Sequence, residues 1–329
     1  MASPVLLDHV YGCLAGLALG DALGLPTEML TPELIAEWYG EIRGLTPIDA
    51  RHPHHNLPRG SVSDDTDQAL LLAHVLLDDG TIEPNRFAQR LLEWSRTPRV
   101  RENRFIGNAT RRALEAIATG TPVETAGHGE TIGAAMRVAP VALACATPEK
   151  LITQVVASCV PTHNTHAAIS GAMAVAFGVA DALNPDATLA TMLDAACEGA
   201  RIGGTFGAWS WTPPLDRRLA WVWRTCEGMS QQDVSRFVYD VVGTGEPPWD
   251  LVASAFAILR ATNAEPMPAL FAAANAGGDT DTLAAIVGAL VGALRGAYAF
   301  DLVMLADVCA VNHFDLSAIA RRLVMVREE

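Results

Sequence analysis

The stretch Ala274-Asn275-Ala276-Gly277-Gly278-Asp279-Thr280-Asp281-Thr282 runs directly into the long apolar segment 282–300, and the two together point to the fold class. The segment is rich in Ala, Leu, Val and Ile, and its length suits a helix that follows a turn. Half of the 329 residues are apolar and only 6% are aromatic, so the sequence predicts an all-α fold. Pro, Gly or Asp clusters separate six further helix-like stretches: 66–79, 109–119, 132–147, 165–183, 187–200 and 250–262.

Small residues recur every four positions in two of the predicted helices. The stripes are Gly12, Gly16, Gly20 and Gly24 near the N-terminus, and Gly288, Gly292 and Gly296 near the C-terminus. Such spacing allows a second helix backbone to approach closely. A membrane helix is the competing interpretation, but Asp21 and Arg295 interrupt the segments, which lack the ~20 uninterrupted apolar residues of a span. We therefore expect close helix packing and no membrane partner.

The charge and the cysteine content limit which functions and which cellular compartment are expected. The chain carries 37 acidic and 23 basic side chains, and no segment has a basic cluster that could follow a phosphate backbone, so direct nucleic-acid binding is not expected. Six widely spaced cysteines without a C-x-x-C pair indicate reduced core thiols. Asp8 lies where a secretory signal needs basic residues before an apolar run, so we expect a cytoplasmic protein.

A first acidic cluster, Ser63-Asp64-Asp65-Thr66, stands immediately before the apolar run 69–77. That position predicts a helix N-terminus. Ser and Asp there satisfy free backbone N–H groups and suit the positive end of the helix dipole. For this cluster alone, a helix cap is the better interpretation.

The second cluster, Asp279-Thr280-Asp281-Thr282, follows a glycine pair and again begins a helix. On a non-helical turn the carboxylates of Asp279 and Asp281 can converge on one point, with the Thr282 hydroxyl beside them. Two such clusters are harder to explain as caps, because carboxylates packed together are costly unless cations neutralise them.

The predicted ligands are hard oxygen donors, which favour Mg²⁺ or Mn²⁺ over zinc. Asp281 could bridge two ions about 3.5 to 4 Å apart, so we expect two ions per chain. The clusters do not match an EF-hand loop, a Walker phosphate loop or a G-x-S-x-G nucleophile elbow. The haloacid-dehalogenase motif that Asp279 to Thr282 faintly suggests would follow an apolar strand, not glycines.

These motifs resemble those of the ADP-ribosylglycohydrolases, the family that includes dinitrogenase reductase-activating glycohydrolase. The resemblance implies one compact orthogonal helical bundle over residues 1–329, with a dinuclear metal cleft. It rests on four stretches that cover nearly the whole chain: 16–24 followed by Pro26-Thr27-Glu28, Ser63 to Thr66, Thr162-His163-Asn164, and 274–282.

By motif match, each side chain takes a role in the cleft. Ser63, Asp64, Asp65 and Asp281 would hold one ion, and Asp279, Asp281 and Thr282 the other. Glu28 would lie over the cleft and bind substrate, as would Gly133 and His163 in its lining. Asp279 or Glu28 could be the catalytic base; a water held by the ions and deprotonated by another carboxylate is the alternative.

Two departures from the family pattern concern the substrate. Thr131-Ile132-Gly133 stands where members commonly have Gly-Asn-Gly, and Thr165-His166 stands where many bacterial members have His-Pro. A polar group that faces substrate is thereby replaced, so we expect an acceptor preference unlike that of arginine-specific members. Ser63 replaces the usual threonine, but its hydroxyl can still coordinate an ion.

Three weaker signals in the sequence are better explained by structural roles than by functional ones. The loop with His52, His54 and His55 matches no zinc spacing and is predicted to be a polar surface loop. Gly243-Thr244-Gly245 could approach a phosphate, but one Gly-x-Gly is weak support. The four tryptophans at 209, 211, 221 and 223 could stack on adenine, whereas core packing is expected for at least two of them.

The predicted function is metal-dependent hydrolysis of an N- or O-glycosidic bond between ADP-ribose, or a related ribosyl group, and its acceptor. The partner would be an ADP-ribosylated protein or a small ADP-ribosyl compound. An altered protein that binds or senses ADP-ribose without turnover is the alternative, because Ile132 could uncouple binding from catalysis. A purely structural role fits poorly with retention of every metal-motif oxygen.

Overall fold

The computed structural model describes residues 3–103 and 105–328. Within these residues the chain forms nineteen α-helices, and its extended pairings are three isolated bridges, so the predicted all-α class is confirmed. In chain order the elements are α1 (Pro4–Gly24), η1 (Leu25–Thr27), α2 (Pro32–Tyr39), α3 (Asp64–Asp79), α4 (Pro84–Ser95), α5 (Pro98–Asn103), α6 (Asn108–Ala118), α7 (Val123–Ala126), α8 (Gly133–Met136), α9 (Ala139–Ala144), α10 (Pro148–Cys159), α11 (His166–Ala182), α12 (Leu189–Gly203), α13 (Leu215–Thr225), α14 (Gln231–Phe237), η2 (Val238–Val242), α15 (Pro248–Ala261), α16 (Pro266–Ala274), α17 (Thr280–Arg295), η3 (Ala297–Ala299), α18 (Leu302–Asn312) and α19 (Leu316–Glu328).

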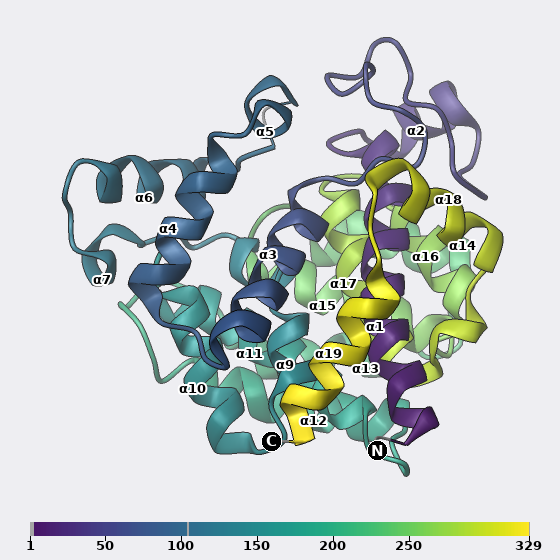
Figure 1. The fold of residues 1–329 in the computed structure, drawn as a ribbon. Coiled ribbons are helices and arrows are strands. Elements are labelled where there is room, and N and C mark those ends of the chain that lie inside the picture. Colours follow the sequence, from purple (N-terminus) through teal and green to yellow (C-terminus); the bar gives the residue numbers. More distant parts are fainter. Residues whose placement is uncertain (1–2, 104, 329) are drawn as a thin grey trace.

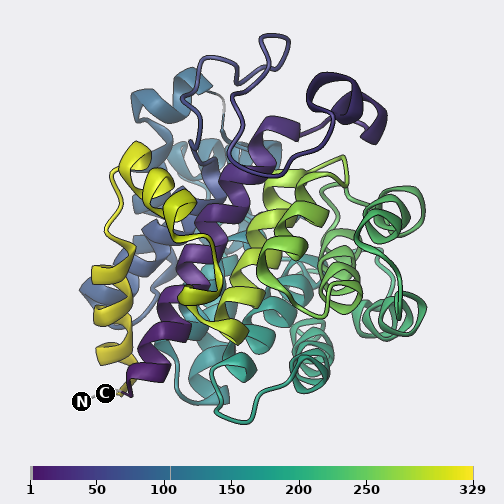
Figure 2. The same cartoon turned by 90° about the vertical axis from the view of Figure 1, so that its right-hand side faces the viewer.

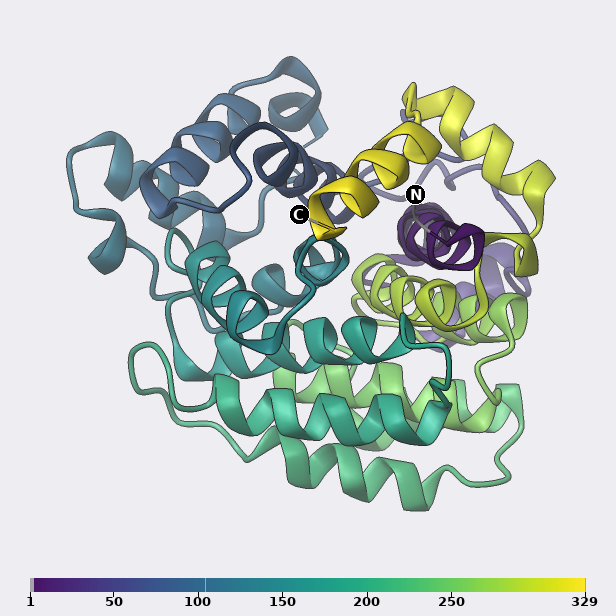
Figure 3. The ribbon, with the colours of Figure 1, turned by 60° about the horizontal axis from the view of Figure 1, so that its bottom comes forward.

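The two glycine-striped helices, α1 and α17, lie antiparallel through the middle of the molecule (Figure 1). A Cβ atom at Gly16 would lie 2.0 Å from the carbonyl oxygen of Gly288, and one at Gly292 would lie 1.9 Å from that of Gly12. The two backbones therefore touch, and close packing is confirmed. Seen end-on, α1 lies between the C-terminal helices α18 and α19 and the pair α16 and α17 (Figure 3).

The antiparallel register brings the C-terminal end of α1 beside the N-terminal end of α17. Gly24 packs on Thr280, and the Thr27 hydroxyl lies 3.0 Å from the Thr280 hydroxyl. Both chain termini lie together at the opposite end of the molecule, away from the loop that leads into α3 (Figure 2). Segments more than 250 positions apart in sequence thus meet at one end of the bundle.

Two predicted helices are shorter than the apolar segments suggested. The segment 132–147 splits into α8 and α9, because Pro140 lacks an N–H and its ring would collide with the carbonyl of Met136 in a continuous helix. The last glycine-striped helix ends at Arg295 rather than 300, since Gly296 adopts a φ of 78° that terminates it.

The N-terminal segment Pro4–Thr27 is long and apolar enough to cross a bilayer. However, 67% of its most apolar window is buried inside the protein, as in the core helix of a folded domain.

The six cysteines are free, and Cys13, Cys145, Cys159 and Cys226 are buried, as expected of reduced core thiols.

Candidate metal and substrate site

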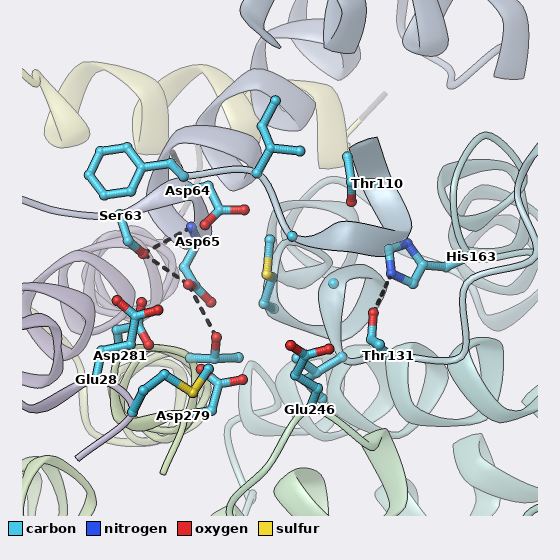
Figure 4. Close-up of a pocket in the computed structure, with 18 of the residues that line it drawn as sticks. Glu28, Ser63, Asp64, Asp65, Thr110, Thr131, His163, Glu246, Asp279 and Asp281 are labelled. Atoms are coloured by element: carbon cyan, nitrogen blue, oxygen red, sulfur yellow. Dashed lines mark hydrogen bonds between the residues drawn. The ribbon is translucent and has the colours of Figure 1, made fainter. Parts of the chain in front are cut away.

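A cavity of about 150 Å³ opens where the C-terminal end of α1 meets the starts of α3 and α17 (Figure 4). The structure brings every residue given a site role from the sequence to this one cavity, although their chemical roles stay predictions. The lining includes Glu28, Ser63, Asp64, Asp65, Gly133, His163, Asp279, Asp281 and Thr282.

The start of α3 is capped twice. The Ser63 hydroxyl accepts the backbone N–H of Asp65 at 3.3 Å, as the helix-cap interpretation predicted. The buried carboxylate of Asp21, from α1, accepts the N–H groups of Ser63 at 2.8 Å and Thr66 at 3.0 Å. Because these groups satisfy the helix end, the Asp64 and Asp65 carboxylates are not needed as caps and can face the cavity.

The start of α17 is built differently. Asp279 occupies the N-cap position, but its side chain makes no capping hydrogen bond. The Thr282 hydroxyl donates to Asp65 Oδ2 at 3.3 Å, and the Ser63 hydroxyl donates to the same oxygen at 2.9 Å. Asp65 therefore joins the two clusters (Figure 4), while the Asp279 and Asp281 carboxylates line the cavity.

The glycine pair before Asp279 serves packing against protein rather than against a ligand. Gly277 and Gly278 have φ of 86° and 81°, and Gly278 forms an antiparallel bridge with Leu30. A Cβ at Gly278 would lie 2.3 Å from the Thr244 hydroxyl oxygen. The Gly-x-Gly loop thus supports this turn, since the Thr244 carbonyl accepts the N–H of Asp279 at 2.7 Å.

Glu28 is held at the cavity by the histidine loop. His54 Nε2 lies 3.2 Å from Glu28 Oε2, and His52 Nε2 lies 3.0 Å from the Glu28 carbonyl oxygen. His52 is only 2% exposed, and His54 packs against the Phe105 ring. The prediction of a polar surface loop is wrong for both, because the loop folds back over the end of α1.

Burial shapes the electrostatics of the acidic side. It raises the pKa of the Asp64, Asp65 and Asp281 carboxyls well above their usual range, and neighbouring negative charges raise the pKa further. Burial also raises the pKa of Asp279 to about 6. Among the described groups, Asp65 Oδ1 and Asp281 Oδ1 are buried without a hydrogen-bond partner. Such oxygens are unfavourable unless a proton or a cation neutralises them.

The donor set fits a hard divalent cation. No Lys or Arg belongs to the described lining, so the protein itself supplies no facing ammonium or guanidinium. Carboxylate and hydroxyl oxygens are the ligands that Mg²⁺ and Mn²⁺ prefer. Within residues 3–103 and 105–328, however, no three Asp, Glu, His or Cys side chains form a compact metal cluster as they stand. The identity and number of ions therefore stay predictions.

The opposite wall is formed by His163. A Cβ at Gly133 would lie 2.7 Å from His163 Cε1, so Gly133 makes room for the imidazole. Arg137 Nη2 donates to the Thr162 hydroxyl at 2.7 Å, and that hydroxyl lies 2.7 Å from His163 Nδ1. Because the Thr162 hydrogen is free to donate to Nδ1, the Nε2–H is left to donate to Thr131 Oγ1 at 3.0 Å.

Burial and the nearby Arg137 lower the pKa of His163 to about 3, so the imidazole is neutral. Arg137 is fully buried, and burial lowers its own pKa to about 10. Its Nη1 donates to Gln68, whose side-chain amide donates to Asp64 Oδ2 at 2.7 Å. One chain of hydrogen bonds therefore links the histidine wall to the acidic wall, which is formed by Asp64, Asp65, Asp279 and Asp281.

Sequence reasoning missed several groups. Asp21 had a signal, a carboxylate in the middle of a long apolar run, but was considered only as an interruption of a membrane span. Thr110, Thr131 and Glu246 also line the cavity, and no pattern marked Thr110 or Glu246. The tryptophans lie outside the described lining, with Trp209 and Trp211 at 77% and 85% exposed and Trp221 at 37%. Only Trp223 among the four packs against the core, so the core prediction for two is wrong.

Comparisons with known proteins agree with this arrangement. The family model of the ADP-ribosylglycohydrolases matches residues 2–329. Uncharacterized protein YegU of Escherichia coli (strain K12) is 31% identical over 98% of each chain. ADP-ribosyl-[dinitrogen reductase] glycohydrolase of Rhodospirillum rubrum is 33% identical over 50% of this chain and 54% of its own. A solved structure named ADP-ribosylglycohydrolase-related protein complex is 28% identical, with a TM-score of 0.71 over 98% of this chain and 99% of that one. The resemblance found in the motifs is confirmed: the chain belongs to the ADP-ribosylglycohydrolase family.

Proposed function

We propose that the protein hydrolyses the N- or O-glycosidic bond between ADP-ribose, or a related ribosyl group, and its acceptor, and that it needs divalent cations to do so. The observation that carries this proposal is the gathering of two acidic helix starts around one cavity, with two buried carboxylate oxygens that lack partners. Family membership supports the reaction class. The names of relatives support ADP-ribosylated protein as the substrate class.

The acidic wall would hold the ions. One ion would be held by Ser63, Asp64, Asp65 and Asp281. The other would be held by Asp279, Asp281 and Thr282. Bound there, magnesium-class ions would orient the ribose hydroxyls and stabilise negative charge on the attacking oxygen. A cavity of about 150 Å³ is small for a whole ADP-ribose, so part of the ligand would extend through the mouth.

Glu28 is the better placed of the two proposed bases. It is partly exposed at the cavity, and His54 holds its carboxylate at 3.2 Å. Asp279 would be a ligand, and cations lower the pKa of a carboxylate that binds them, which weakens it as a base. Glu28 would therefore accept the proton of the attacking water, and Asp279 would serve binding.

The histidine wall would orient substrate. Thr131 accepts from His163, so its own hydroxyl hydrogen is free to donate to an oxygen of the substrate. Ile132 is buried in the same wall and offers no hydrogen bond. We therefore expect acceptor selection by shape and by Thr131, and a preference unlike that of arginine-specific members.

Turnover of ADP-ribosyl-arginine, ADP-ribosyl-serine and simple ribosides, with and without Mg²⁺, tests the proposal. We expect hydrolysis that requires the metal and does not favour arginine alone; Glu28→Gln should lower kcat much more than it raises KM. Efficient cleavage of ADP-ribosyl-arginine with no activity on other acceptors would contradict the specificity.

A protein that binds ADP-ribose without turnover is the second candidate, and the apolar Ile132 in the cavity wall is the observation that favours it. Calorimetric titration with ADP-ribose distinguishes the two. Tight binding by a protein that cleaves none of the three substrate classes in Mg²⁺ or Mn²⁺ would replace the hydrolase proposal with this one.

A further inference from the structure

Charge is distributed very unevenly along this acidic chain. Residues 84–118 contain eight arginines and three glutamates, a formal charge of +5, while the whole chain carries -14. The remainder therefore carries -19. This segment departs from our expectation that no segment of the chain carries a basic cluster. It forms α4, α5 and α6, which project together at one side of the molecule (Figure 1).

A groove of about 900 Å³ runs between these three helices. Exposed Arg96, Arg101 and Arg111 line it, above the buried apolar side chains of Val100 and Leu114. Ile106 lines both this groove and the acidic cavity, so the two adjoin. A group that emerges from the cavity past Ile106 would meet a basic rim and an apolar floor.

Six of the arginines of the segment divide into two sets by partner. Three of them pair with aspartates of α3 and hold the segment to the bundle: Arg86 with Asp79, Arg90 with Asp78, and Arg99 with Asp67. Arg96 and Arg101 form no ion pair with any described residue, and Arg111 pairs with Glu115 one turn along its own helix. The guanidinium groups of Arg96 and Arg101 therefore have unused donors that face the groove.

We propose that the groove between α4, α5 and α6 docks an acidic, partly apolar segment of the protein that carries the ADP-ribosyl group. Planar guanidinium groups bind carboxylates through paired hydrogen bonds, and a buried apolar floor suits Leu or Val between the acidic residues. The proposal rests on the proposed function, because the acceptor chain must lie at the mouth of the cavity while its modified side chain reaches inside.

The lining distinguishes a peptide from a nucleic acid. Grooves that bind single strands combine positive charge with aromatic side chains on which bases stack. Among the described residues that line this groove there is no aromatic side chain, whereas Leu92, Val100, Ile106 and Leu114 provide aliphatic surface. The chemistry therefore favours a peptide with alternating acidic and aliphatic residues.

Direct binding tests the groove without any use of catalysis. Fluorescence anisotropy would compare a labelled peptide of alternating Glu and Leu with a matched peptide of Gln and Leu. Each exposed ion pair contributes only modestly to affinity, so the two arginines are replaced together and with reversed charge. We expect Arg96→Glu/Arg101→Glu to weaken the acidic peptide about tenfold and to leave the Gln peptide within about twofold. Circular dichroism would verify that the variant is folded, and Arg96→Ala/Arg101→Ala would give a smaller loss in the same direction.

The matched control is Arg217→Glu/Arg224→Glu on α13. Both arginines are exposed, neither lines the groove or the cavity, and the change in total charge is identical. An equal loss in this control would show an effect of total charge and would overturn the proposal. So would equal affinity of the natural protein for the two peptides.

Kinetics separate this proposal from the proposed function. On a free ADP-ribosyl amino acid, the groove variant should keep natural kcat and KM; on an ADP-ribosylated peptide with glutamate flanks, only KM should rise, again about tenfold. A protein that binds the acidic peptide through Arg96 and Arg101 but cleaves no ADP-ribosyl compound would refute the function and keep the groove. Normal turnover of ADP-ribosyl compounds without any preference for glutamate flanks would support the function and overturn the groove proposal.

Discussion

Helix α17 joins two regions of opposite character. Along its length, Gly288 and Gly292 bring its backbone against α1 with no space left for a side chain. At its first turn, Asp281 buries a carboxylate oxygen that has no partner, close to the Asp65 oxygen in the same condition. Close packing stabilises the first region, and burial of like charges destabilises the second. The tightly packed α1–α17 seam therefore supports a cavity that is electrostatically unfavourable by itself.

The two regions are also linked by geometry. The register of the seam sets Gly24 against Thr280, so it decides which residues of α1 and η1 reach the cavity. A change in the seam should therefore damage both regions. A change in the cavity should leave the seam intact.

Gly288→Leu breaks the seam and should have the largest effect. A Cβ at Gly288 would lie 1.9 Å from the Gly16 carbonyl oxygen, so the helices must separate along their length. We expect a loss of about 4 kcal/mol or more in the free energy of unfolding, or failure to fold. Urea denaturation followed by circular dichroism measures it. Gly204→Ala is the control, because a Cβ there meets its first neighbour at 3.4 Å. A Gly288→Leu protein with the natural midpoint would contradict backbone contact.

Asp281→Ala breaks the cavity and should spare the seam. We expect activity to fall by about 10³-fold or more, because the proposed bridge between the ions is lost. Removal of a buried carboxylate should leave the metal-free melting temperature unchanged or higher. Asp281→Asn, of the same shape, should be equally inactive. Near-natural turnover in Mg²⁺, or loss of activity that merely follows unfolding, would refute the assignment.

Metal ions should neutralise the carboxylates of the cavity and so reduce the difference in stability between the cavity and the α1–α17 seam. Two ions should bind per chain, and at one hundred times the dissociation constant each should add about 2.7 kcal/mol to the free energy of unfolding. Calorimetric titration of metal-stripped protein gives the number, and thermal melts give the stabilisation. Saturation at one ion, or at none, would defeat the two-ion prediction.

The histidine wall should show the smallest effect, and its sign is opposite to that of the acidic wall. His163 has a pKa of about 3 in the folded protein and about 6.5 when unfolded, so its contribution is fully present above pH 6.5. As pH falls below 6.5, the unfolded chain takes up a proton that the folded chain refuses, and stability is lost. Between pH 6.5 and 5 this amounts to about 2 kcal/mol.

The comparison needed is between the natural protein and His163→Asn, by urea denaturation at pH 7 and at pH 5. The advantage of the natural protein should shrink at the lower pH. Carboxylates with raised pKa bind protons in the folded state and act in the opposite direction, but they are present in both proteins and cancel in the difference. An advantage that is the same at both pH values would mean that His163 is not held neutral.

The sequence pattern predicted the structure correctly where interactions between neighbouring residues determine it. The two helices that carry the glycine stripes and the helix start at Ser63 depend on neighbours within a few residues. The structure has them where the pattern predicted, except that the second striped helix ends at Arg295 rather than 300. The split at Pro140 shows the limit, because an apolar run of the right length concealed a residue that cannot continue a helix.

Local pattern failed where the partner lies far away. His52 and His54 resembled a surface loop until the loop folded over the end of α1. The glycine pair at 277 and 278 marked only a turn in the sequence, and nothing near it indicated that it packs against Leu30 and Thr244. Asp21 was an interruption in an apolar helix until α3 placed its N-terminal N–H groups on that carboxylate.

The helical class, the two glycine stripes, the two acidic helix starts and, through the motifs, the family could therefore all be predicted from the amino-acid sequence alone. Periodicity, turn residues and motif spacing are properties of short stretches, and they can be read without knowing which stretches meet. The folded structure was needed to show that Asp65 rather than Asp64 joins the two clusters and that Gly133 makes room for His163. It also shows that Arg96 and Arg101 line the groove next to the cavity and form no ion pair with any described residue. The physical reason is that the role of a polar or charged side chain depends on its hydrogen-bond or ion-pair partner. In this protein those partners come from distant parts of the chain, which the contact between α1 and α17 brings together.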